Sequence, residues 1–514
     1  MAESRTKNSL KNYSMSVVSQ VTSILLSFIG RTFFIKILSI EYLGVNGLFS
    51  NILSLLSLAE LGVSTAITYM MYKPIAENDK EKVAAYNQLF RKIYNFIGLF
   101  ILLAGLSLTP FIHHLIKNEP QISENIHIIY ALFIINSAIS YFYTYKRALL
   151  IAHQKEYINN TNIIEFAIIK DIVLILLLYI FHNYYFYLTA QILITFASNI
   201  SISIKTNKLF PDIVSMKPVK VSRTEIRAII KNTAAMLCHK IGSVIVSGTG
   251  NIFISYFVGL ATVGIYSNYV LISQAACQIV GKGVNSLTAS FGNLVATAQQ
   301  AEIYRVFKRI YFINFILALN ISTLFYALID PFISLWIGAD YLLETKTSII
   351  IVINSLFFYQ IRVPSQMVIN TYGLFWQIKW KSLIEAVINL CCSFLFAAYL
   401  QMGIIGILLA GLVSNVTTSL WWEPYVATKY GLNTTMKDYL LEFMKNILIL
   451  FTALLTISFL NKQIDTVVQL PIPNMIARSV ATLSVSTILI LLFYHKTKEF
   501  KYIVSFIPRN RPMK

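Results

Sequence analysis

The sequence predicts an all-α polytopic membrane protein of about fourteen transmembrane helices. They form two parallel six-helix repeats around a central cavity, followed by two extra C-terminal helices. The first observation is composition: 56% of the 514 residues are hydrophobic, 13% are charged, and the mean hydropathy is +0.65. A soluble protein would carry about 25% charged residues. Apolar stretches long enough to cross a bilayer, about 20 residues each, recur along the chain and leave no room for a sizeable soluble domain.

The second observation is the order of the apolar segments and of the basic residues between them. Most of the 42 lysines and arginines fall in alternate loops, which predicts that both termini are cytoplasmic. The loops on the other side are short and exclude a large extracellular catalytic domain. Hydropathy places the fourteen helices at 13–37, 43–72, 93–115, 126–149, 157–181, 184–205, 228–258, 262–295, 309–337, 347–370, 380–400, 403–425, 439–460 and 474–495.

The third observation is an internal repeat at a spacing of about 220 residues. Each copy has an even number of helices, so both enter the membrane from the same side, as in transporters built from parallel repeats. We expect an N-terminal lobe at 1–210, a cytoplasmic linker at 211–227, a C-terminal lobe at 228–430, and two further helices with a basic tail at 431–514. The matching residues include Ser23, Ser27, Gly30, Phe33 and Gly44 in the first copy and Ser243, Ser247, Gly250, Phe253 and Gly264 in the second.

Charged residues persist inside several predicted helices. Each costs at least ~2.5–3.5 kcal/mol in hydrocarbon, so it normally faces protein or water. Four cations lie on polar helix faces that we expect to line the cavity: Arg31, Lys240, Lys282 and Arg362. Their surplus positive charge favours an anionic ligand, because guanidinium binds phosphate bidentately and ammonium binds it as a point charge. The other side chains expected to line the cavity are Gln20, Ser27, Asn251, Gln278, Asn285 and Asn354, although such residues also join helices by hydrogen bonds of about 0.6 kcal/mol each.

Three acids are candidates for ion coupling or gating. Glu60 lies on a polar face of the second helix, whereas Glu165 and Glu385 occupy equivalent repeat positions. The equivalent pair also suits a structural role, in which each carboxylate pairs with a neighbouring basic residue.

The sequence favours no enzymatic activity. It contains no Walker motif, nucleophile–base pair or metal-ligand cluster, and we expect neither a metal nor a cofactor. A coupling proton or sodium ion would be a sufficient energy source, at about 2.3 kcal/mol per charge per 100 mV. The net charge of +19 follows the cytoplasmic loops and does not indicate nucleic-acid binding.

Four segments carry a family resemblance. Tyr42 to Ile67 resembles the second helix of bacterial polysaccharide-repeat-unit flippases, of the multidrug/oligosaccharidyl-lipid/polysaccharide exporter superfamily. Arg362–Pro364, Tyr372–Trp376 and Glu385–Asn389 resemble their tenth and eleventh helices.

The resemblance implies two lobes forming a V in the bacterial plasma membrane. Such proteins flip undecaprenyl-pyrophosphate-linked oligosaccharide from the inner to the outer leaflet by alternating access, for O-antigen, capsule or other surface polysaccharide. The implied partners are that lipid-linked oligosaccharide, membrane lipids and the polysaccharide polymerase machinery. By position, Arg31, Lys240, Lys282 and Arg362 would engage the pyrophosphate or charged sugars.

Three alternatives stay open at this point. A lipid II flippase, which handles the peptidoglycan precursor, would use the same architecture. A drug/cation antiporter of the same superfamily predicts a cavity dominated by acids, whereas this one is dominated by cations. A membrane glycan polymerase is disfavoured by the short external loops and the parallel repeat.

Overall fold

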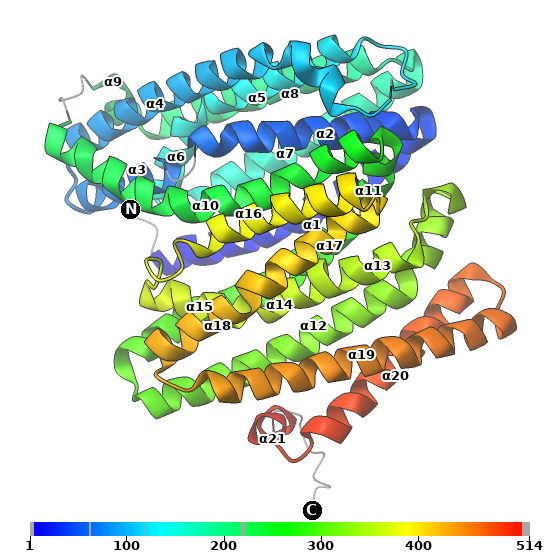
Figure 1. Ribbon diagram of the computed structural model, residues 1–514. Helices are drawn as coiled ribbons and strands as arrows, with labels where there is room; N and C mark the ends of the chain where they lie inside the picture. Colours follow the sequence, from blue (N-terminus) through cyan, green and yellow to red (C-terminus); the bar gives the residue numbers. More distant parts are fainter. Residues whose placement is uncertain (1–4, 61–62, 119, 217–220, 506–514) are drawn as a thin grey trace, which may run out of the picture. The chain divides into compact units, whose positions relative to one another are not determined.

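The computed structural model describes residues 5–60, 63–118, 120–216 and 221–505. Within these ranges every regular element is a helix and no strand occurs (Figure 1). Ten of the described helices are long and apolar enough to cross a membrane. The predicted fold class, an all-α polytopic membrane protein, is therefore confirmed.

The chain divides into two compact units, which we describe separately: unit 1 is Met1–Gly264 and unit 2 is Ile265–Lys514. The lobe boundaries expected from the repeat stay a prediction.

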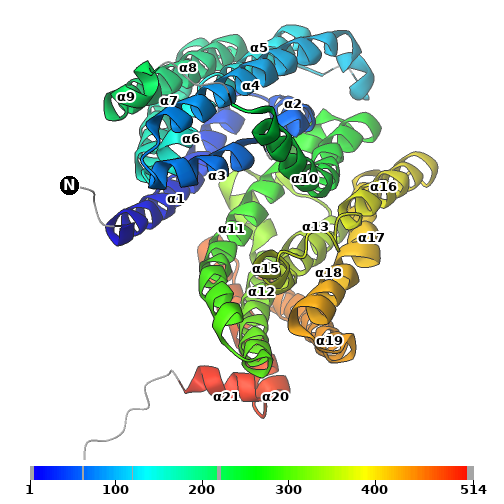
Figure 2. The same cartoon turned by 90° about the vertical axis from the view of Figure 1, so that its left-hand side faces the viewer.

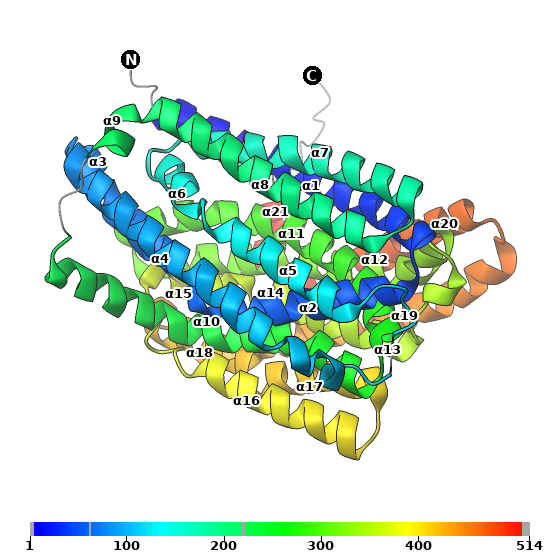
Figure 3. The same cartoon turned by 90° about the horizontal axis from the view of Figure 1, so that it is seen from above.

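In unit 1, α1 packs along α7, α7 along α8, and α4 along α5 (Figures 1 and 3). The last helix of the unit, α10, packs against α2. The helices are α1 Arg5–Ile37, α2 Ile40–Leu56, α3 Val63–Ala76, α4 Lys80–Ser107, α5 Ile126–Tyr141, α6 Thr144–Ala152, α7 Glu156–Phe181, α8 Tyr184–Leu209, α9 Pro211–Ser215 and α10 Arg223–Phe257, with 3₁₀ turns at Ser57–Glu60 and Thr109–Leu115.

Two predicted segments of unit 1 are interrupted. The segment 43–72 consists of α2, the 3₁₀ turn Ser57–Glu60 and α3, and the segment 126–149 consists of α5 and α6. Helix α7 spans its predicted range but is not among the ten described helices that are long and apolar enough to cross a membrane. Its apolar half carries three charged residues, Glu165, Lys170 and Asp171, which lower its apolar character.

In unit 2, α12 lies at the centre and packs against α19 and α20 (Figure 2). Its buried Phe312 and Phe315 contact the ring of Tyr494, which anchors the two extra helices to this core. The helices are α11 Leu260–Thr297, which begins at the end of unit 1, α12 Gln300–Trp336, α13 Thr345–Ile351, α14 Tyr359–Ile361, α15 Val363–Tyr372, α16 Lys381–Phe394, α17 Gly403–Ser414, α18 Leu420–Val426, α19 Met436–Val467, α20 Pro471–Tyr494 and α21 Lys498–Val504, with a 3₁₀ turn at Ala339–Tyr341.

Four π-helical turns interrupt the helices of unit 2, at Val352–Phe358, Leu395–Tyr399, Asn415–Ser419 and Ala427–Leu432. Such wide turns are rare and often occur at functional sites, because they rotate the side chains that follow them. The described part of unit 1 contains none. The π turns therefore mark the region 352–432 as the part of unit 2 where side-chain placement departs from the regular helical spacing.

Helix starts in unit 1 follow local sequence signals. Asp79 accepts a hydrogen bond from the Lys82 N–H at the start of α4. Ser222 and Glu225 form a reciprocal capping box at the start of α10. The hydrogen bonds from Ser222 and Tyr86 lower the pKa of Glu225 to about 2, because they stabilise the ionised carboxylate.

The starts of α2 and α11 approach each other closely at two glycines. A Cβ atom at Gly44 would lie 2.0 Å from the Leu260 carbonyl oxygen, and one at Gly264 would lie 2.5 Å from the Ile40 carbonyl oxygen. Gly44 and Gly264 are equivalent in the internal repeat, as are Ile40 and Leu260. The two contacts are thus the same contact made twice, and each requires the absence of a side chain.

Candidate functional site

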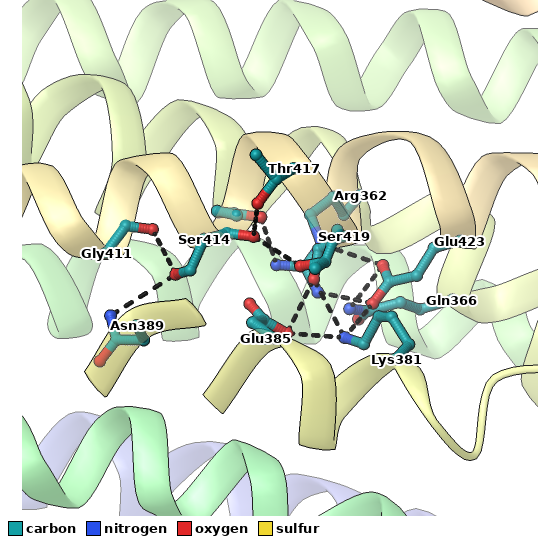
Figure 4. Close-up of polar contacts among 12 residues, drawn as sticks. Arg362, Gln366, Lys381, Glu385, Asn389, Gly411, Ser414, Thr417, Ser419 and Glu423 are labelled. Atoms are coloured by element: carbon teal, nitrogen blue, oxygen red, sulfur yellow. Dashed lines mark hydrogen bonds and ion pairs between the residues drawn. The ribbon is translucent and has the colours of Figure 1, made fainter. Parts of the chain in front are cut away.

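A buried network of charged side chains lies within unit 2, between α14–α15, α16 and α18 (Figure 4). At its centre the Arg362 guanidinium donates from Nε and Nη2 to the two carboxylate oxygens of Glu423, at 2.9 and 2.6 Å. This is a bidentate, charge-assisted pair, the strongest arrangement available to a guanidinium. The Glu423 side chain is only 2% exposed and that of Arg362 12%.

Lys381 joins the same carboxylate from α16. Its ammonium group donates to Glu423 Oε1 at 2.8 Å and to Ser419 Oγ at 3.0 Å, and lies 3.1 Å from Glu385 Oε2. An ammonium has three N–H donors, and the three acceptors match them. The Ser419 hydroxyl in turn donates to Glu385 at 2.9 Å, which closes the group.

Neutral amides extend the network along the helices. Arg362 Nη1 donates to Asn415 at 3.1 Å, and Asn415 donates to Asn354 at 3.0 Å. Gln366 also donates to Glu423, at 3.2 Å. The four ionised groups are two cations and two carboxylates, so the network is formally neutral.

The backbone around the network explains how distant residues meet. Arg362 follows the π turn Val352–Phe358 and precedes Pro364, at the first turn of α15. The π turn Asn415–Ser419 directly precedes α18 and supplies two of the polar partners. Lys381 and Glu385 are four residues apart on α16 and therefore share a helix face.

The structure brings together three of the predicted site residues: Arg362, Glu385 and Asn354. It adds two that the sequence reasoning missed, Lys381 and Glu423. Both lie within two residues of the end of a predicted helix, at 380–400 and 403–425, where a charged side chain normally reaches the membrane surface. The four-residue spacing of Lys381 and Glu385 was the available signal for at least one of them.

The two other predicted acids lie in unit 1 with partners of their own. Glu60 accepts a hydrogen bond of 2.8 Å from the Tyr94 hydroxyl, at the break between α2 and α3. Glu165 is exposed and pairs with Lys205 at 2.9 Å. The repeat-equivalent acids Glu165 and Glu385 thus both contact a lysine, one at an exposed site and one in a buried network.

The remaining predicted residues are distributed over both units. Arg31 lies on α1, close enough to the Tyr187 hydroxyl for an electrostatic interaction. Asn251 donates to the Gly47 carbonyl at 3.3 Å, and Ser27 donates to the carbonyl of Ser23 in its own helix. Gln20 on α1 is half-buried, and Gln278 on α11 is exposed. The side chains of Lys240, Lys282 and Asn285 lie outside the described residues.

Comparison with known proteins identifies the fold. No protein-family model and no curated protein sequence matches the chain. Among solved structures it is similar to the lipid II flippase MurJ in an inward closed conformation, with a TM-score of 0.65 and 14% identity over 93% of this chain and 98% of that one. It is also similar to an inward-facing MATE-family multidrug transporter of the MOP superfamily, with a TM-score of 0.63 and 14% identity over 79% and 95% of the two chains.

A third similar structure is a mutant of the Vibrio cholerae MATE transporter VcmN, with a TM-score of 0.57 and 15% identity over 84% and 99%. At these identities the comparison establishes architecture. The chain is a multi-pass membrane protein with the fold of the MATE and MOP superfamily transporters.

Proposed function

We propose that this protein is a transporter that flips a polyprenyl-pyrophosphate-linked oligosaccharide from the inner to the outer leaflet of the bacterial plasma membrane. One observation favours a flippase over the multidrug transporters that share this fold. The lipid II flippase matches 93% of the chain, and the region from Met436 onward is longer than the unmatched remainder. The match therefore includes part of the two extra helices, whereas matches to the multidrug transporters cover 79% and 84%.

The chemistry of the substrate fits the basic residues predicted inside the helices. A pyrophosphate group carries negative charge into the membrane interior, where only cations or hydrogen-bond donors stabilise it. Arg31, Lys240 and Lys282 are the proposed ligands. Arg362 differs from these three residues because its N–H groups already donate to Glu423. Phosphate oxygens would have to compete with that carboxylate to bind Arg362.

We also propose that Glu60 couples transport to a proton or sodium ion. It is an acid on a polar helix face with a tyrosine hydroxyl as its hydrogen-bond donor. Loss of transport in Glu60→Gln, with Tyr94→Phe as the companion variant, tests this assignment. Transport that keeps its ion dependence in Glu60→Gln would remove Glu60 from the mechanism.

Lipid II is the second candidate substrate, and the similarity to a lipid II flippase favours it. It carries the same pyrophosphate and polyprenyl groups, so the proposed ligands do not distinguish the two. The distinction lies in the glycan.

The decisive experiment compares cells with and without this gene. Lipid-linked glycans are extracted, identified by mass, and assigned to a leaflet with an impermeant probe. Accumulation of complete repeat units on the inner leaflet supports the oligosaccharide flippase, and accumulation of lipid II supports the second candidate. Unchanged pools of both contradict the proposal, and repeat units that are outside but unpolymerised indicate a polymerase.

Point variants then test the ligands. Arg31→Ala should abolish flipping while the protein still reaches the membrane in folded form, measured by size-exclusion profile in detergent. If this variant fully restores flipping in cells that lack the gene, Arg31 is not a ligand of the pyrophosphate.

A further inference from the structure

Three cations of unit 1, Arg91, Lys146 and Arg147, have no carboxylate partner among the residues that the structure describes. Arg147 on α6 donates to Asn159 at 2.5 Å, to Asn162 at 3.2 Å, to Ser198 at 3.3 Å and to Asn199 at 3.4 Å. These oxygens accept hydrogen bonds from Nη1 and Nη2 of the guanidinium. They carry no formal charge, so the positive charge of Arg147 remains.

Its neighbour Lys146 is in the same situation. The residue is 4% exposed, and its ammonium donates to the Asn207 amide oxygen at 2.5 Å. The ammonium also lies 5.2 Å from the centre of the Tyr145 ring. The ammonium is thus contacted by one amide oxygen and one ring face, in surroundings that screen its charge poorly.

Arg91 on α4 completes the group from the solvent-accessible side. Its guanidinium lies 5.8 Å from the centre of the same Tyr145 ring, and its charge repels that of Lys146. Unlike Lys146, Arg91 is exposed. Helices α4 and α6 pack together, so the juxtaposition is fixed by the core of the unit.

Other cations of the same unit do have carboxylate partners. Lys80 lies 2.6 Å from Asp212, Lys82 lies 3.3 Å from Glu225, and Lys205 lies 2.9 Å from Glu165. Over the described residues, no ion pair involves Arg91, Lys146 or Arg147. Arg91 and Lys146 both lie near the Tyr145 ring where α4 meets α6, in segments that the distribution of basic residues assigns to the cytoplasmic side.

We infer that Arg91, Lys146 and Arg147, which we call the α4–α6 cation cluster, form a binding site for a phosphate group on the cytoplasmic side. The exposed Arg91 guanidinium contacts the phosphate oxygens through its planar fork. Lys146, which is buried, and Arg147, which is half-buried, add positive potential, which raises the local concentration of anions. The phosphate belongs either to a free anion or to a lipid headgroup, and the inference does not depend on which substrate the protein transports.

Binding is measured on the full-length protein in neutral detergent, by titration with sodium phosphate against sodium chloride at equal ionic strength. The variant Arg91→Gln removes an exposed side chain and should fold. The matched control is Lys80→Gln, which removes one exposed cation from the same helix but one that is paired with Asp212.

We expect phosphate to bind the unmodified protein and Lys80→Gln equally and to bind Arg91→Gln at least tenfold more weakly. The source of the phosphate is then identified by competition in nanodiscs. Displacement of phosphate by phosphatidylglycerol, and not by phosphatidylcholine, assigns the site to lipid headgroups, whereas no displacement assigns it to free phosphate. Equal phosphate affinity in Arg91→Gln and Lys80→Gln, or no phosphate-specific binding to the unmodified protein, overturns the inference.

Discussion

The α4–α6 cation cluster of unit 1 and the Arg362–Glu423 network of unit 2 bury the same kinds of cation in opposite ways. In unit 2, Arg362 and Lys381 share two carboxylates and the sum of charges is zero. In the described part of unit 1, Arg147 and Lys146 donate hydrogen bonds to neutral oxygens and pair with no carboxylate. The first arrangement holds helices together by mutual neutralisation. The second arrangement supplies acceptors for the cations' N–H groups but leaves a positive electrostatic potential, which a bound anion would balance.

The largest expected effect comes from removing one carboxylate from the neutral Arg362–Glu423 network. Glu423→Ala leaves Arg362 and Lys381 buried with Glu385 as their one carboxylate, and we expect a loss of about 3–5 kcal/mol in unfolding free energy. Chemical denaturation in detergent measures it. The double variant Arg362→Met, Glu423→Met should recover part of that loss, because fewer unpaired charges remain. A double variant less stable than the single one would contradict the neutralisation account.

The next prediction concerns steric overlap without any change of charge. Its size provides a reference for the stability losses expected from the charge-changing variants. Gly44→Ala places a methyl group 2.0 Å from the Leu260 carbonyl oxygen, and overpacking of this kind costs about 1–3 kcal/mol. Thermal unfolding in detergent checks it. Gly250→Ala is the control, since a Cβ atom there meets nothing within 4 Å. Equal melting temperatures for the two variants would show that helices α2 and α11 can move apart without a loss of stability.

Removing a cation from unit 1 should cost less than removing an acid from unit 2. Arg147→Met leaves neutral acceptors at Asn159, Asn162 and Asn199, and unsatisfied groups of this kind cost about 1–3 kcal/mol, partly offset because a buried charge disappears. The same denaturation assay compares it with Glu423→Ala. A loss as large as that of Glu423→Ala would mean that the two arrangements bury charge at equal cost.

The smallest expected effect concerns a surface carboxylate of unit 1 that does find partners. The folded-state pKa of Glu225 is about 2 against an ordinary value of 4.5. Its stabilisation is therefore present above pH 4.5 and is lost as the pH falls toward 2. Glu225→Gln keeps an acceptor for the Ser222 N–H, so stability at pH 7 should fall by less than about 1 kcal/mol, the usual worth of a helix cap, while the acid side of the stability curve flattens. An unchanged dependence of stability on pH would show that the Glu225 carboxylate does not contribute to the stability of the protein.

Hydropathy was sufficient for the placement of helices because the length and polarity of a segment are local properties. It also found Arg362 and Glu385, since charges deep in apolar segments stand out. It did not find that Glu423 pairs with Arg362, because the pairing joins residues 61 positions apart and depends on how each helix is rotated. The π turns that set this rotation have no clear mark in the sequence. The break at Ser57–Glu60 was missed because apolar residues continue through it.

The glycine contact between α2 and α11 is symmetric with respect to the internal repeat. Ile40 and Gly44 meet Leu260 and Gly264, so the contact is unchanged when the two copies of the repeat are exchanged. Self-complementary contacts of this kind are what two identical subunits form across a twofold axis. Here both halves of such a contact lie in one polypeptide, so each glycine is constrained by the carbonyl oxygen opposite it, and a side chain at either position would force α2 and α11 apart.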